Sequence, residues 1–340
     1  RISTVVFERI LIVIMETADN GKYAVDSKMQ YHYHHIEQNH KRRRMEYFRR
    51  AIVFQKENTM KRIITVQDIS CVGKCSLTVA LPVISAMGVE AAILPTAVLS
   101  THTAFKGFTF RDLTEDITPI CDHWKREKIS FDAIYTGYLG SFEQLDLMKK
   151  MFADFGGKDV LVFVDPCMAD NGKLYPGFTQ EFAFAMAKLA GLADVIAPNM
   201  TEASFMLGVP YKAAGEYDEA YIKDILKKLA ALGAKRIVLK GVEFAEKAGK
   251  IGIMSYDSES GAYTSYFHEK CATSFHGTGD IFASVCVGAL MRGRSLEQSY
   301  ALAADFVVES IKATVSHKDY NWYGVDFESA IPYLVKRLGA

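Results

Sequence analysis

The sequence predicts an α/β protein with a mainly parallel central sheet that is covered by helices on both faces. Three observations support this prediction. Strand-like and helix-like segments alternate from residue 60 to the end of the chain, which is typical of parallel sheets. Several strands are continuous apolar runs, as expected where both faces of a sheet are buried. Polar residues follow most strands, at the edge where open α/β sheets bind ligands.

Short apolar strands and a helix-ending glycine define the first half of the predicted sheet. Residues 63–66 are rich in β-branched side chains and predict a strand, and the helix predicted over 76–87 ends at Gly88. The next strand, at 91–94, leads into a loop that contains 96–102. The elements after this loop are expected to be a helix at 113–128, a strand at 133–135, a helix at 144–155, a strand at 160–164 and a helix at 179–189.

The second half continues the alternation and adds a hairpin. A strand at 195–197 is followed by Asn199, and a strand at 236–239 is followed by Lys240. Two β-rich runs between residues 251 and 268 flank a polar turn and predict a hairpin. Helices are expected at 202–207, 217–232, 281–291, 296–315 and 327–338.

A glycine-rich turn precedes the helix expected at 281–291. Gly277 and Gly279 lack a Cβ, so the backbone can turn sharply and approach a ligand. With Thr278 between them, they lead into a helix N-terminus, whose free N–H groups and positive dipole end bind anions. Asp280 stands at this point, where a carboxylate either caps the helix or acts as a base. An ordinary capped turn is the simpler alternative.

Polar residues at the strand ends indicate one shared cleft, although any one of them would also suit a solvated loop. They are Asp68, Ser70, Thr96, Tyr138, Asp165, Asn199, Glu202 and Lys240. Together with the anion-binding turn, they provide what phosphoryl transfer to an alcohol requires: a cation for the phosphates, oxygen ligands for magnesium, and a base. Neither the P-loop pattern GxxxxGK[ST] nor the protein-kinase motif set occurs in the sequence.

The composition argues against several classes of protein. The 340 residues carry 40 basic and 40 acidic side chains, a balance that does not suggest a nucleic-acid or membrane-surface partner. No apolar run approaches the roughly 18 residues of a membrane span. The six cysteines form no CxxC pair, which favours reduced thiols and a cytoplasmic location over a disulfide scaffold or a zinc site.

Residues 1–59 differ in composition from the rest of the chain. A His/Tyr run at 31–35 and a basic run at 41–44 could bind a metal ion or an acidic partner. We expect instead a poorly ordered extension, or one translated from upstream of a true start at Met60. Residues 60–340 are expected to form the functional domain.

Six motifs in one order give the chain from Met60 to Ala340 a resemblance to the ribokinase-like superfamily, and most closely to its pyridoxal (pyridoxine, pyridoxamine) kinase branch. The motifs are VQDIS at 66–70, PTAVLSTHT at 95–103, TGYLG at 136–140, VDPCMADNGKLY at 164–175, PNMTEA at 198–203 and GTGD at 277–280. The resemblance implies a three-layer α/β/α fold with a mainly parallel sheet. It also implies ATP with Mg²⁺, a homodimer, and a monovalent cation as a candidate second cofactor.

The resemblance implies a role for each candidate residue by its position. Asp280 resembles the base that takes the proton from the substrate hydroxymethyl group. Gly277, Thr278 and Gly279 resemble the anion hole for the γ-phosphoryl group. By the same resemblance, the metal ligands are Asp165 and Glu202, the ATP-binding residues are these two with Asn199 and Lys240, and the substrate-binding residues are Asp68, Ser70, Thr96 and Tyr138 together with Asp280.

Two departures from the family pattern leave the substrate open. Asp68 stands where many pyridoxal kinases have Ser, and Ala97 where many have Gln. Asp68 could bind a ring nitrogen, a hydroxyl or an amine, or could cap a turn. The leading interpretation is a kinase of vitamin B6 vitamers that forms pyridoxal 5′-phosphate. The alternatives are a hydroxymethylpyrimidine kinase of the same superfamily and a non-catalytic protein that binds a vitamer or nucleotide. His102 and His276 are interpreted as loop residues that form hydrogen bonds.

Overall fold

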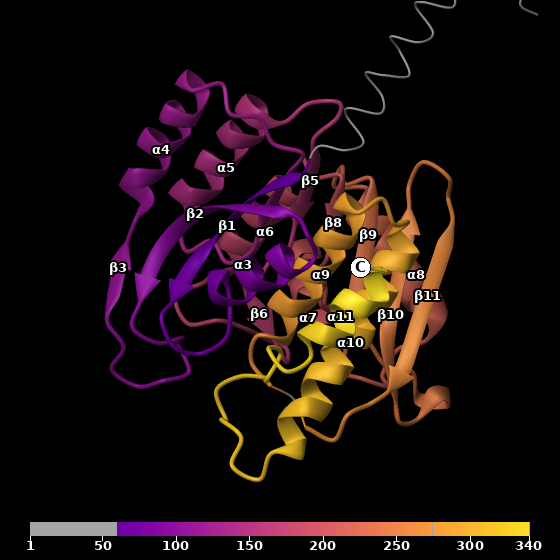
Figure 1. Cartoon of the computed structure of the whole chain (residues 1–340). Coiled ribbons are helices and arrows are strands. Elements are labelled where there is room, and N and C mark those ends of the chain that lie inside the picture. The colour runs from indigo at the N-terminus through magenta and orange to yellow at the C-terminus, as the bar shows by residue number, and fades with distance from the viewer. Residues whose placement is uncertain (1–59, 274, 340) are drawn as a thin grey trace, which may run out of the picture. The chain divides into compact units, whose positions relative to one another are not determined.

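The computed structural model of the protein describes residues 60–273 and 275–339. In this part of the chain a nine-stranded sheet has the order β11-β10-β9-β8-β5-β4-β1-β2-β3 (Figure 1). The six strands from β9 to β2 pair in parallel, while β3 at one edge and the β10–β11 hairpin at the other are antiparallel. The strands are β1 (Arg62–Ser70), β2 (Glu90–Leu99), β3 (Phe110–Asp112), β4 (Ala133–Thr136), β5 (Leu161–Val164), β8 (Val195–Ile196), β9 (Arg236–Val242), β10 (Lys250–Asp257) and β11 (Tyr263–Glu269). A separate small hairpin is formed by β6 (Ala169–Asp170) and β7 (Lys173–Leu174).

Helices cover both faces of the sheet and enclose two hydrophobic cores. One core is formed with α4 (Thr114–Arg126), α5 (Phe142–Phe155), α6 (Gln180–Ala190), α7 (Met200–Leu207) and α8 (Glu219–Ala230). The other is formed with α3 (Leu77–Ala86), α9 (Thr278–Met291), α10 (Leu296–Ser316) and α11 (Ile331–Leu338), which Figure 1 shows in front of the central strands.

Successive residues of β1 are buried on opposite faces of the sheet. Ile63 packs into the core with α3 and α9, and Ile64 into the core on the opposite face, because successive side chains of a strand point to opposite faces. Both are fully buried. The predicted three-layer α/β/α fold with a mainly parallel sheet is therefore confirmed.

Several elements differ from the predictions. β1 continues to Ser70 and β9 to Val242, whereas the expected strands end at 66 and 239, because both keep their pairing with a neighbouring strand. Asp68, Ser70 and Lys240 therefore lie within strands instead of just after them. The helix expected from residue 281 begins at Thr278, and β3 was not predicted.

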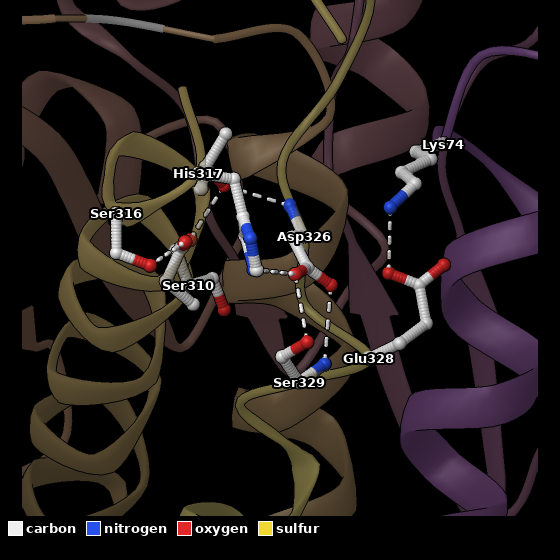
Figure 2. Close-up of polar contacts among 9 residues, drawn as sticks. Lys74, Ser310, Ser316, His317, Asp326, Glu328 and Ser329 are labelled. Atoms are coloured by element: carbon white, nitrogen blue, oxygen red, sulfur yellow. Dashed lines mark hydrogen bonds and ion pairs between the residues drawn. The ribbon is translucent and has the colours of Figure 1, made fainter. Parts of the chain in front are cut away.

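The expected loop at 96–102 is wrong in its first part, because β2 continues to Leu99, where it pairs with β3. The last helix begins at Ile331 instead of residue 327, because Asp326 accepts hydrogen bonds from the N–H and hydroxyl of Ser329 and so forms a turn first (Figure 2). The β6–β7 hairpin was not predicted, although its turn has the Asn-Gly sequence that favours two successive left-handed residues.

A register shift in the sheet occurs beside the candidate site residues. Gln67 pairs with Pro95 and Ile69 pairs with Val98, so Asp68 stands opposite two residues of β2, one of which is Thr96. Such bulges bend a strand and re-aim its side chains. The shift brings the first and second predicted site motifs together at the carboxyl end of the parallel strands.

Two earlier expectations concern membranes and the N-terminal extension. Across residues 60–339, with 274 set aside, no helix is both long and apolar enough to span a bilayer. The expected extension at 1–59, with its His/Tyr and basic runs, lies outside the residues that the structure describes.

Candidate active site

The N-terminus of α9 is built around Gly277. This residue is the N-cap of the helix, with φ 82° and ψ −4°, a left-handed conformation that favours glycine. A Cβ at this position would lie 2.1 Å from the carbonyl oxygen of Lys74. Gly279, in the first turn, is exposed, and a Cβ added there would meet no protein atom within 4 Å. The first turn of α9 is therefore open to a ligand, as an anion site requires.

Asp280 follows in the same turn and is partly exposed. No side chain caps α9; instead, Oδ2 of Asp280 accepts a hydrogen bond of 3.0 Å from the backbone N–H of Ser76. Burial raises the pKa of Asp280 to about 7 against the opposing effect of this bond, and the carboxylates of Asp165 and Asp68 raise it further. Both protonation states are thus populated near neutral pH, where general bases are most effective.

Ser76 connects Asp280 to Asp68, a role that was not predicted. Its hydroxyl donates to Oδ1 of Asp68 over 2.6 Å, while Ser70 donates to Oδ2 over 2.9 Å. Burial raises the pKa of Asp68, and the two hydroxyl bonds oppose that rise. Ser76 is the N-cap residue of α3, but its side chain does not cap the helix. In a sequence, a serine before a helix normally indicates a side-chain N-cap. The contacts of Ser76 with two carboxylates therefore could not be predicted from its position.

A buried ion pair lies further along the sheet edge. Nζ of Lys240 is 2.8 Å from Oδ1 of Asp165, and their side chains are 15% and 5% exposed. Burial alone would lower the pKa of Lys240, but the carboxylates of Asp165 and Glu202 raise it above its ordinary value. The lysine is therefore positively charged at all physiological pH values. A fixed positive charge is what contact with a phosphate group requires.

Glu202 and Asn199 form a capping box at the start of α7. Glu202 N–H donates to Oδ1 of Asn199, and Asn199 N–H donates to Oε2 of Glu202, each over 2.8 Å. The other oxygen of Glu202 accepts a longer bond, 3.4 Å, from Met168 N–H. Burial raises the pKa of Glu202 to about 8, with Asp165 adding to the rise and Lys240 opposing it. The pattern N-x-x-E at 199–202 is the sequence signal for such a box, but the box was not among the predicted features.

The candidate substrate side contains an unpaired buried hydroxyl. Within the described residues Thr96 Oγ1 is buried and has no hydrogen-bond partner, and buried hydroxyls are normally paired. Tyr138 is half-buried, and its ring centroid lies 5.6 Å from that of Phe178. Burial, together with the nearby Asp68 carboxylate, raises the pKa of Tyr138 to about 12. These groups offer a hydrogen-bonding hydroxyl and an aromatic ring to a ligand.

The loops around the site are joined to the C-terminal segment. Lys74 Nζ lies 2.8 Å from Oε2 of Glu328 (Figure 2). Nδ1 of His102 accepts a bond from Ala104 N–H, so Nε2 donates to the carbonyl oxygen of Tyr323 over 2.9 Å. His102 is therefore a loop residue that forms hydrogen bonds, as we predicted. Burial lowers the pKa of the neighbouring His276 ring.

The carboxylates of the site could supply only some of the ligands of a magnesium ion. No group of three or more His, Cys, Asp or Glu side chains arranged to hold a metal ion occurs in 60–273 or 275–339. Magnesium, however, usually keeps several waters and uses one or two carboxylates together with substrate phosphates. Asp165 fits this pattern, because Lys240 occupies only its Oδ1. Glu202 fits less well, since both its oxygens accept backbone bonds.

Comparison with known proteins gives a family match over most of the chain. A family model described as phosphomethylpyrimidine kinase matches residues 79–323. A crystal structure of a protein from Bacteroides thetaiotaomicron, provisionally assigned as a phosphomethylpyrimidine kinase and crystallised with pyridoxal, is 36% identical to this chain. It has a TM-score of 0.77, and the match covers 81% of this chain and 96% of that one.

Two further relatives represent the two substrate classes. The structure of pyridoxal kinase from Lactobacillus plantarum is 32% identical, with a TM-score of 0.74 and coverage of 82% of this chain and 98% of that one. A hydroxymethylpyrimidine/phosphomethylpyrimidine kinase of Bacillus subtilis is 25% identical over 56% of this chain and 66% of its own length. The family model and the relatives are thus all named as kinases, and their names differ in the substrate that is phosphorylated.

Proposed function

Because the chain belongs to the phosphomethylpyrimidine kinase family, we propose that it transfers a phosphoryl group from ATP to the 5′-hydroxymethyl group of pyridoxal, pyridoxine or pyridoxamine. The observation that carries this proposal is the placement of Asp280. Its carboxylate is held by Ser76, is partly exposed, and lies in the open first turn of α9. A B6 vitamer is favoured as acceptor because a 36% identical relative was crystallised with pyridoxal.

The residues of this chain suggest a division of labour in the reaction. Asp280 takes the proton of the substrate hydroxyl as its oxygen attacks the γ-phosphorus, and the bond between that phosphorus and ADP breaks. The N–H groups of Gly277, Thr278 and Gly279 stabilise the charge on the phosphoryl oxygens. Lys240 adds a fixed positive charge on the nucleotide side.

Magnesium and ATP would be held at the end of the sheet that contains Asp165. Asp165 is the better candidate ligand for the ion, and Glu202 with Asn199 shapes the start of α7 beside it. When bound, magnesium would offset the charge of the phosphate oxygens.

The proposal also includes a homodimer, a cytoplasmic location and a monovalent cation. Light scattering and assays with and without added potassium test the dimer and the cation.

The substrate side of the proposal assigns the ring to Asp68, Ser70, Thr96 and Tyr138. Asp68→Ala is expected to raise KM for the vitamer with little effect on KM for ATP, because Asp68 lies at the β1–β2 bulge, opposite the stretch of β2 that contains Thr96 with its unpaired hydroxyl. Steady-state kinetics with each substrate varied in turn provide the measurement. Equal rises in both constants would place Asp68 away from the ring.

A second candidate function follows from the family description, which names phosphomethylpyrimidine. The purified chain should be assayed with ATP and magnesium against pyridoxal, pyridoxine, pyridoxamine and hydroxymethylpyrimidine, with Asp280→Asn as the blank for contaminating kinases. We expect the highest kcat/KM for a B6 vitamer. A preference for hydroxymethylpyrimidine would establish the second candidate instead. Nucleotide binding without turnover of any of the four would indicate a binding protein.

Gly279→Ala tests the anion site without lowering the stability of the fold. The added Cβ meets no protein atom, and alanine is favoured over glycine in a helix by about 1 kcal/mol, so the melting temperature should stay equal or rise. The same Cβ should obstruct the phosphate site and lower kcat by about tenfold. The control is Gly288→Ala in the same helix, for which the opposite result is expected. The Cβ added at this position would lie 2.6 Å from Sδ of Met87. This substitution should lower the melting temperature and spare kcat; full activity in Gly279→Ala would contradict the anion site.

A further inference from the structure

Ser76 makes two contacts of different kinds with two carboxylates of the site. Its backbone N–H donates to Oδ2 of Asp280 over 3.0 Å, and its hydroxyl donates to Oδ1 of Asp68 over 2.6 Å. The contact with Asp280, in α9, spans 204 positions of the sequence, whereas Asp68, at the end of β1, is only 8 positions from Ser76. Among the described residues no other hydrogen bond to the Asp280 side chain is found.

The backbone of Ser76 has a conformation that glycine would adopt more easily. Its φ is 52° and its ψ is −132°, and a non-glycine residue persists in such a conformation only where its surroundings enforce it. The hydroxyl bond to Asp68 is such a constraint, because Asp68 is only 6% exposed and is held by Ser70 on its other oxygen. The conformation in turn directs the N–H of Ser76 to Asp280.

We infer that Ser76 is a positioning residue, whose hydroxyl, anchored on Asp68, keeps its N–H on one oxygen of Asp280 and so leaves the other oxygen to the substrate alcohol. The inference rests on the proposed function, because it takes Asp280 as the base. It also gives Asp68 a second task that does not require contact with the substrate ring. A serine at the start of α3 is thereby part of the apparatus that presents the base.

A hydrogen bond to a carboxylate favours its charged form, so loss of this N–H should raise the pKa of Asp280. Other groups that face Asp280 act in both directions: the carboxylates of Asp165 and Asp68 raise its pKa and Lys240 lowers it. The thiols of Cys75 and Cys167 and the phenols of Tyr135 and Tyr175 also lie within its electrostatic reach. Since a base acts when deprotonated, a raised pKa moves the acid limb of the kcat profile to higher pH.

The test is Ser76→Ala, assayed from pH 6 to pH 9 with ATP and the acceptor that the parent uses best. We expect kcat at pH 7 to fall by about tenfold, the acid limb to move up by about one pH unit, and KM for both substrates to stay within about twofold. Ser76→Gly should recover part of the loss, because glycine adopts the required backbone without the hydroxyl. The control is Thr78→Val, which removes a hydroxyl bond to the carbonyl oxygen of Cys75 in the same turn and should leave the profile unchanged. An unmoved acid limb, or a loss in Ser76→Gly as large as in Ser76→Ala, would overturn the inference.

A measurement without substrate separates this inference from the proposed function. The carboxyl carbons of ¹³C-labelled aspartates are titrated by NMR in the parent and in Ser76→Ala, with Asp280 identified by the signal missing in Asp280→Asn. A higher Asp280 pKa in Ser76→Ala supports the inference even if none of the four alcohols is phosphorylated. An equal pKa in the two proteins would overturn it even if pyridoxal is an excellent substrate.

Discussion

Asp280→Asn is expected to lower kcat by about 10²–10⁴-fold, which corresponds to about 2.7–5.4 kcal/mol of transition-state stabilisation. The substitution keeps the shape of the side chain and removes both the base and its charge. Nucleotide binding should be retained, because Lys240 and the backbone N–H groups of residues 277–279 are unchanged. The measurement is steady-state kinetics with the best acceptor, and turnover within about threefold of the parent would show that Asp280 is not the base.

The same variant should be at least as stable as the parent above neutral pH. The folded state raises the pKa of Asp280 above its ordinary value, so folding favours the protonated form, and the parent loses stability as the pH rises from about 4 to about 7. Asparagine is neutral throughout and does not incur this loss. Thermal melts at pH 5 and pH 8 provide the comparison. The control is Asp154→Asn, which removes a carboxylate that pairs with Lys125 at the end of α5 and should leave kcat unchanged.

Lys240→Met is expected to destabilise the fold by about 3–5 kcal/mol at pH 8, the typical cost of leaving a buried charge without its partner. Asp165 would remain in the sheet edge without the 2.8 Å contact to Nζ. For a domain of this size the melting temperature should fall by roughly 10 °C. Activity should fall as well, since the nucleotide side loses its cation.

The pH dependence of this loss identifies its cause. Burial raises the pKa of Asp165, and removal of the lysine raises it further, so the carboxyl becomes protonated at low pH and the uncompensated charge disappears. The difference in melting temperature between variant and parent should therefore be smaller at pH 5 than at pH 8. Lys235→Met is the control, because Lys235 pairs with Asp194 over 2.6 Å but is 56% exposed, and such pairs contribute about 0–1 kcal/mol. Similar losses in the two variants would contradict the role of burial.

The sequence predicted those features of the fold and site that depend on local patterns. Continuous apolar strands such as β5 indicated burial on both faces, and Gly277 and Gly279 marked the N-terminus of α9. Contacts between distant segments were beyond its reach. The bond from Ser76 to Asp280 uses a backbone N–H, which every residue but proline possesses, and depends on φ and ψ values unusual for serine. Likewise, the pairing of β3 with β2 extends a strand that was predicted to end at residue 94.

The contact between Ser76 and Asp280 also limits how early the proposed site can assemble during synthesis of the chain. It joins residues 204 positions apart, and the ion pair of Lys74 with Glu328 spans 254 positions. The ribosome releases the N-terminal partner of each pair first, and long chain segments must close before such contacts form. A nascent chain that already contains the six parallel strands but ends before α9 lacks Asp280, the proposed base, and so has no partner for the Ser76 N–H. The proposed site can therefore assemble only after α9 has emerged and packed against α3 and the sheet.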